Sequence, residues 1–254
     1  MPREHDIADR TWTEVADIMG RPARKMIALL PIGSTEPHGP HLPLATDVII
    51  SVETARRAAL RLEAHDLGCL ILPAVAYTVT DFSEGFSGAV GLTHETSRSM
   101  VIEICRSALT HGFAAVCLVN SHLEPEHLAA LREAAAQVTR ETGQPVIFPD
   151  KTQARWARRL TAEFRSGACH AGRYETSLVL ACRPELVREK IRSELRPVDI
   201  SIGRKIQQGA RSFREAGGDR AYFGDPAAAS AAEGESTYEV LAEMIATAVV
   251  EALG

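Results

Sequence analysis

Short apolar runs alternate with longer amphipathic stretches along this 254-residue chain, and the alternation constrains the fold more than any other feature. Four runs lack helical periodicity and end in polar or Pro/Gly-containing residues, as buried parallel strands do. They are Met26–Ile32, Cys69–Val75, Ala114–Val119 and Val146–Phe148. The sequence therefore predicts a layered α/β fold with a mostly parallel central sheet.

Between and after these expected strands lie stretches rich in Ala, Leu, Arg and Glu, with apolar residues at helical spacing. Helices are predicted over Val48–Ala64, His94–Thr110, Pro125–Glu141, Thr152–Arg165 and Ser236–Ala252. The stretch Asp199–Gly234 is Gly- and Ala-rich and weakly periodic, which predicts an excursion from the layers or an oligomer contact. Since no repeat or low-complexity linker divides the chain, we expect one domain over residues 1–254.

Composition excludes several classes of protein. The 28 Lys+Arg residues are scattered among 33 Asp+Glu, for a net charge of −5, so we expect no nucleic-acid partner. No run approaches the roughly 20 apolar residues of a membrane span, and the charged start has no signal-peptide pattern, which together predict a cytoplasmic protein without a membrane partner. The five cysteines include no CxxC pair and are expected to be reduced core thiols.

Three potential metal ligands, Glu36, His38 and Asp47, lie within twelve residues after the first expected strand. In an extended, Pro-stiffened segment, residues at i and i+2 project to the same side, so Glu36 and His38 can face one point. Asp47 then opens the next expected helix. His122 and Glu124 repeat the i, i+2 pair after the third expected strand.

Two His/Glu pairs and one further carboxylate are the ligands that a two-metal site needs. They follow the carboxyl ends of the expected strands, where such sheets bind ligands. Each ion would take one His and one Glu, with Asp47 bridging. These ligands suit Zn²⁺ and Mn²⁺, with Fe²⁺ a third candidate, and two such ions can hold a hydroxide between them while one polarises a carbonyl. The alternative is structural: Glu36 caps a helix or forms a salt bridge, His38 bonds the backbone, and His122 enters a helix.

A third constellation, His170 and Glu175, precedes the apolar run Leu178–Cys182. A neutral His170 beside a metal-bound hydroxide could move a proton to a leaving nitrogen. Glu175 either caps the following helix or takes part directly in the metal site, and the sequence leaves both open.

Residues next to the expected ligands are candidates for a supporting role. His41 follows the ligand loop, and Asn120 precedes His122. The remaining histidines lie in helix or terminus contexts that are typical of exposed or hydrogen-bonded residues: His5, His65, His94, His111 and His127.

Four blocks of the sequence resemble those of a known family, the creatininases or creatinine amidohydrolases. The family's metal loop is similar to LLPIGSTEPHGPHLPLATD (residues 29–47), and its Asn-Gly-His block is similar to LVNSHLEPEH (118–127). Its His-Ala-Gly and Glu-Thr-Ser block is similar to HAGRYETSLVLACRPELV (170–187), and its Gly-rich C-terminal signature to FGDPAAASAAEGE (223–235). The similarity runs in order over about residues 10–250.

The resemblance implies a three-layer α/β/α sandwich, a homohexamer, and two divalent ions that serve the hydrolysis of a C–N bond in a small amide. By position, Glu36, Asp47 and His122 match the ligands of one ion, and His38, Asp47 and Glu124 match those of the other. His170 matches the proton-transfer histidine. We expect His170 and Glu124 to be the catalytic residues, supported by His41, Asn120 and Glu175.

The expected pocket lining departs from the family. Creatininase has tryptophans near its substrate pocket, whereas the corresponding regions here, 148–152 and 164–168, contain none. We therefore expect a small amide, lactam or formamide substrate other than creatinine, cleaved at a non-peptide C–N bond. The alternatives are a true creatininase, a formamide deformylase, a protease that trims a peptide during cofactor maturation, and a non-catalytic metal-binding assembly subunit.

Overall fold

The computed structural model describes residues 4–20 and 24–254 and contains a four-stranded parallel sheet in the order β2-β1-β3-β4. The strands are β1 (Met26–Ile32), β2 (Gly68–Ile71), β3 (Ala115–Asn120) and β4 (Val146–Ile147). Met26 of β1 lies opposite Gly68, and Ile27 lies opposite Ala115. All four predicted strands are confirmed, although β2 ends before Pro73, which has no N–H for a sheet.

Ten α-helices lie within the described residues. They are α1 (Trp12–Met19), α2 (Thr46–Glu63), α3 (His94–Thr110), α4 (Pro125–Thr142), α5 (Ala154–Ala157), α6 (Ala162–Ser166), α7 (Arg173–Cys182), α8 (Glu189–Arg192), α9 (Ile202–Gln207) and α10 (Ala231–Leu253). Short 3₁₀ turns occupy η1 (Ile7–Asp9), η2 (Asp81–Ser83), η3 (Pro184–Leu186) and η4 (Pro226–Ala228).

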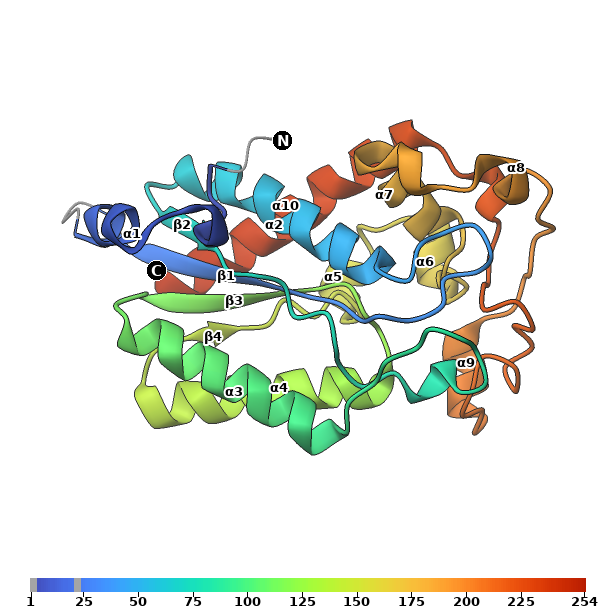
Figure 1. Ribbon diagram of the computed structural model, residues 1–254, viewed down its shortest axis with the longest axis horizontal. Helices are drawn as coiled ribbons and strands as arrows, with labels where there is room; N and C mark the ends of the chain where they lie inside the picture. The colour runs from blue at the N-terminus through green and yellow to red at the C-terminus, as the bar shows by residue number, and fades with distance from the viewer. Residues whose placement is uncertain (1–3, 21–23) are drawn as a thin grey trace.

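Alternate residues of β1 enter two separate apolar cores, and this alternation produces the layers. Ile27 and Leu29 join a core with α2, α7 and α10, whereas Ala28 and Leu30 join one with α3 and α4. Successive side chains of a strand point to opposite faces, so a run buried on both sides needs helices on each. Figure 1 shows α2 and α10 on one face of the sheet and α3 and α4 on the other, which confirms the predicted three-layer α/β/α fold.

One predicted helix, over 152–165, is wrong. The structure has two short helices there, α5 and α6, separated by residues 158–161. The Thr161 side chain accepts a hydrogen bond from the backbone N–H of Phe164 (3.3 Å), so it caps a new helix and ends the old one. Trp156, Leu160 and Phe164 are all buried in one core, and their i, i+4, i+8 spacing explains the helical expectation.

Residues 199–223, the excursion loop, are tied together at their base and reach the carboxyl end of the sheet. The flanking residues Val198 and Gly224 form an antiparallel bridge with backbone hydrogen bonds of 2.9 and 2.8 Å. Farther along, the N–H of Phe213 donates to the carbonyl of Phe82 (2.9 Å), in the segment after β2. The excursion predicted over 199–234 is thus confirmed for residues 199–223, whereas residues 231–234 belong to α10. An oligomer contact at this region stays a prediction.

Two further observations concern the state of the cysteines and the length and polarity of the helices. All five cysteines are free thiols, and only Cys182 is not fully buried. Within the described ranges, the helices are too short or too polar to cross a membrane.

The contact between α10 and α7 depends on a glycine. A Cβ atom at Gly234 would lie 1.9 Å from the carbonyl oxygen of Ser177, so Gly234→Ala forces the two helices apart. We expect this substitution to lower the free energy of unfolding by about 1–3 kcal/mol, as overpacking does. Gly203→Ala, in α9, is the matched control because a Cβ there meets no atom within 4 Å. Urea denaturation of both variants measures the difference, and equal stability would contradict the close contact.

Candidate metal centre

Polar side chains from separate segments meet at the carboxyl ends of β1 and β3. Glu36 and His38 lie on the loop after β1, and Asp47 is the second residue of α2. His122 follows β3, and Glu175 lies in the first turn of α7. All five side chains are buried, with at most 4% of their residue surface exposed.

Gly33 brings the loop after β1 against the start of α2. A Cβ atom at this position would lie 2.5 Å from the backbone nitrogen of Val48 and 2.7 Å from the Cβ of Asp47. Only glycine permits this approach. As a result, the Asp47 carboxylate reaches the two ligands predicted on the preceding loop.

Glu36, Asp47 and His122 form a first group of three possible ligands. His122 Nδ1 lies 3.2 Å from Glu36 Oε1 and 3.1 Å from Asp47 Oδ2. This set is the one that the sequence predicts for one ion.

His38, Asp47 and Glu175 form a second group, which shares Asp47 with the first. His38 Nε2 lies 3.3 Å from Asp47 Oδ1 and 3.6 Å from Glu175 Oε2. The same Glu175 oxygen accepts a hydrogen bond from the N–H of Ala171 (2.6 Å), which fixes the carboxylate at the start of α7. The structure therefore places Glu175, beside His38 and Asp47, where the sequence suggested Glu124.

Backbone carbonyls orient both histidines. His38 Nδ1 donates to the carbonyl of Glu36 (3.1 Å), and His122 Nε2 donates to the carbonyl of Val79 (2.7 Å). Each ring therefore turns its other nitrogen toward the carboxylates. Such bonds from the outer nitrogen are what fix the tautomer and orientation of a metal-binding histidine.

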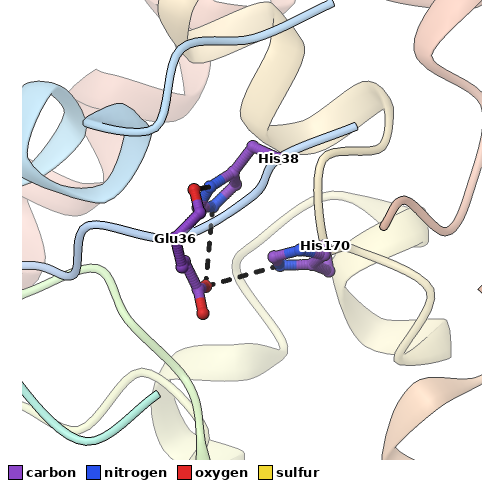
Figure 2. Close-up of side chains that lie close together, drawn as sticks. All are labelled: Glu36, His38 and His170. Atoms are coloured by element: carbon purple, nitrogen blue, oxygen red, sulfur yellow. Dashed lines mark hydrogen bonds and ion pairs between the residues drawn. The ribbon is translucent and has the colours of Figure 1, made fainter. Parts of the chain in front are cut away.

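Glu36, His38 and His170 form a third group of three possible ligands, in which His170 is the partly exposed member. Figure 2 shows the rings of His38 and His170 approaching the Glu36 carboxylate from different sides, each with a nitrogen 3.9 Å from Oε1. His170 Nε2 donates to the carbonyl of Pro37 (3.0 Å), and the ring stacks on Phe213 of the excursion loop at 4.2 Å. Burial, with the charge of His38, lowers the pKa of His170 to about 4, so its ring is neutral at pH 7.

Glu124 lies in the same pocket but outside all three groups of possible ligands among the described residues. Its carboxylate accepts hydrogen bonds from the N–H groups of Asp81 (3.0 Å) and Phe82 (3.3 Å). Burial raises the pKa of Glu124 to about 7, although the charge of His122 opposes the rise. A carboxyl group with this pKa can exchange protons near neutral pH.

Residues 79–83, between β2 and α3, hold the site together, and the sequence analysis missed them. The hydroxyls of Thr80 and Ser83 donate to Glu36 Oε2 at 2.5 and 2.9 Å. Backbone groups of the same segment bind Glu124 and His122, as described above. A Thr/Ser-containing stretch after the second strand is the signal that could have found them, because the carboxyl ends of parallel strands share one edge of the sheet.

Asn120, His127 and His41 support the ligands. Asn120 Oδ1 accepts from the N–H of His122 (3.2 Å) and from His127 Nε2 (2.9 Å). His127 is fully buried, which the sequence left open. His41 Nε2 bonds the hydroxyl of Thr176 (2.9 Å) and so links the ligand loop to α7.

The charge balance of the site depends on buried carboxylates beside imidazoles. Burial alone would raise the pKa of Glu36, but His122 outweighs it and lowers the pKa to about 2. Burial would lower the pKa of His38, but Asp47 and Glu175 outweigh it and raise the pKa to about 10. The pKa of His122 is raised well above its usual value for the same reason. The centre therefore attracts positive charge.

The arrangement fits divalent cations. His38 Nε2 and Asp47 Oδ2 are buried and lack hydrogen-bond partners among the described residues. Both atoms lie within the groups of possible ligands, and their mixed imidazole and carboxylate chemistry suits Zn²⁺ or Mn²⁺. The structure thus shows a plausible metal-binding cluster, while the role of each residue stays a prediction.

Comparisons with known proteins identify the family of this chain. A family model, described as creatinine amidohydrolase (creatininase), matches residues 8–249. The mycofactocin precursor peptide peptidase of Mycobacterium tuberculosis (strain ATCC 25618 / H37Rv) is 31% identical over 229 residues, or 87% of this chain and 84% of the relative. The creatinine amidohydrolase of Pseudomonas putida is 28% identical over 201 residues, or 71% of this chain and 73% of the relative.

Solved structures share the fold. A crystal structure of creatinine amidohydrolase has a TM-score of 0.76 at 23% identity and covers 97% of both chains. A creatininase structure designated Mn has a TM-score of 0.74 at 22% identity, with 97% of this chain and 98% of that one covered.

Glutamine substitutions distinguish the two candidate carboxylates. Because Glu175 faces His38 and Asp47, we expect Glu175→Gln to lose at least half of the bound divalent metal. Glu124→Gln is the matched variant, and we expect it to keep the wild-type metal content because its carboxylate bonds backbone N–H groups instead. Metal analysis of the purified proteins, after loading with Zn²⁺ or Mn²⁺, measures both. The reverse pattern would assign the second ion to Glu124.

Proposed function

This chain belongs to the creatininase family, and we propose that it is a metal-dependent amidohydrolase that cleaves a C–N bond. The observation that carries the proposal is the pair of buried ligand groups that share Asp47, next to a neutral histidine. Two overlapping groups suit a pair of ions. A structural role for these residues is less favoured, because it would leave His38 Nε2 and Asp47 Oδ2 with ion-pair contacts of 3.3 and 3.1 Å but no hydrogen bond.

In this proposal, Glu36, Asp47 and His122 hold one cation, and His38, Asp47 and Glu175 hold the other. Zn²⁺ and Mn²⁺ are the favoured ions, with Fe²⁺ a third candidate, because availability often decides which metal such ligands take. When bound, the pair supplies Lewis acidity that activates a water molecule and polarises the carbonyl of the substrate.

His170 moves the proton. Because its Nε2–H is donated to the carbonyl of Pro37, the free lone pair is on Nδ1, the atom that faces Glu36. Nδ1 can accept the proton of the attacking water and then donate it to the departing nitrogen, which completes the hydrolysis. The stacked ring of Phe213 covers one face of the imidazole and keeps bulk water from it.

Glu124 is the second candidate for proton transfer. Two backbone N–H groups hold its carboxylate at the wall of the same pocket, and its pKa of about 7 suits exchange with a reacting group. We propose that Glu124 assists His170, with His41 and Asn120 supporting the ligands behind them.

The C–N bond can belong to one of two classes of substrate. We favour a small amide, lactam or formamide, since the pocket lined by most of the ligands has a cavity volume of only about 60 Å³. A peptide bond is the second candidate, because the relative at 31% identity is a peptide peptidase. A single-domain chain, a homohexamer and a cytoplasmic location accompany this proposal as predictions.

A hydrolysis screen tests the function. The metal-loaded protein is incubated with creatinine, 2-pyrrolidinone, N-formyl compounds and short peptides, and released amine is measured. We expect about two ions per chain and turnover of at least one class, with loss of activity on chelation and recovery on adding metal back. Stable metal without turnover of any class would favour the non-catalytic assembly subunit, and failure to bind metal would overturn the proposal.

Substitution of His170 separates proton transfer from metal binding. His170→Gln keeps a side-chain N–H for the Pro37 carbonyl but loses the basic nitrogen. We expect the rate to fall by about 10²–10⁴-fold with metal content unchanged. His111→Gln, at the exposed end of α3, is the control and should keep the wild-type rate. A His170→Gln variant with the wild-type rate would exclude this histidine from the reaction.

A further inference from the structure

The pocket is lined by two chemically different sets of residues. Besides Cys169, these are the ionisable residues of the metal centre and six apolar residues, which we call the apolar wall. The wall consists of Phe82, Leu123, Pro125, Ile202, Ile206 and Phe213. These residues come from three separate parts of the chain: the segment after β2, the entry to α4, and the excursion loop.

The two isoleucines of the wall lie one helical turn apart on α9 and both line the pocket. Both are only half-buried, although burial of such side chains is favourable. Ile202 packs at the margin of the small core around Phe213 and Phe223, but Ile206 belongs to none of the apolar cores of the described residues. Part of this wall therefore faces the pocket without an apolar partner.

The charge of the pocket restricts what can lie against the wall. None of the described lysines or arginines lines the pocket, while Glu36, Asp47, Glu124 and Glu175 do. An anionic group would meet no positive side chain on the apolar side, and a polar group would lose its hydrogen bonds to water. An uncharged apolar group loses nothing and gains by burial.

We propose that this wall is an apolar subsite that receives an aliphatic or aromatic substituent of the amide substrate. The inference rests on the proposed function, because the metal centre defines where the reacting amide lies. Ile202, Ile206 and Leu123 are then specificity-determining residues, and substrates whose reacting amide carries no substituent larger than a methyl group on either its carbonyl or its nitrogen are poor ones.

Hydroxamates test the subsite without knowledge of the natural substrate. A hydroxamate binds a divalent ion through its two oxygens, so it anchors at the metal centre and directs its substituent along the pocket. Acetohydroxamate and isovalerohydroxamate differ by three carbon atoms. Their affinities for the Zn²⁺- and Mn²⁺-loaded protein are measured by titration calorimetry, and burial of the three extra carbons predicts at least about a tenfold lower Kd for isovalerohydroxamate.

Alanine variants localise the preference. We expect Ile206→Ala to reduce the ratio of the two Kd values about threefold or more, because it removes part of the wall. Ile191→Ala is the matched control, since Ile191 is a partly exposed isoleucine of α8 that does not line the pocket. Metal content is measured for each variant to show that the centre is intact.

The outcomes separate the subsite from the proposed function. A tenfold preference that falls in Ile206→Ala but not in Ile191→Ala supports the subsite. Equal Kd values for the two hydroxamates overturn the subsite and leave the metal centre in place. If neither hydroxamate binds a protein shown to contain metal, the proposed function and the subsite are both overturned.

Discussion

Two carboxylates buried at the end of a parallel sheet need positive charge, and the rest of the site is organised around that need. Glu36 and Asp47 are each only 1% exposed, and an unpaired anion in such surroundings is strongly unfavourable. Each faces an imidazole nitrogen whose orientation a backbone carbonyl has already fixed. Either protons or metal ions can supply the charge, and the ligand chemistry favours metal ions.

Residues 79–83 hold in place site residues that lie far apart in the sequence. Its hydroxyl groups, N–H groups and one carbonyl each bind a different site residue, so a shift of the segment would misplace Glu36, His122 and Glu124 together. Short hydrogen bonds to charged groups are among the stronger polar contacts in proteins. The site is therefore anchored to the sheet from several sides.

Local patterns predict much of this molecule. The apolar runs identify all four strands, and the Glu36–His38 and His122–Glu124 pairs identify the end of the sheet where the chemistry is concentrated. Local patterns do not predict contacts between distant segments. The sequence could not place Glu175 beside His38, because α7 docks through tertiary packing that one segment does not reveal. The stack of Phe213 on His170 was equally hidden, since it depends on how the excursion loop folds back.

The antiparallel bridge at the base of the excursion loop has an evolutionary consequence. Because Val198 and Gly224 are bonded to each other, the loop begins and ends at one point. Its exposed residues can therefore change while the sheet keeps its place, whereas Phe213 and Ala221 are held by contacts with His170 and with the N–H of Gly39 on the ligand loop. The exposed part of the loop is thus free to vary. Duplicated copies of the gene can diversify there while they inherit the same carboxylate–imidazole cluster.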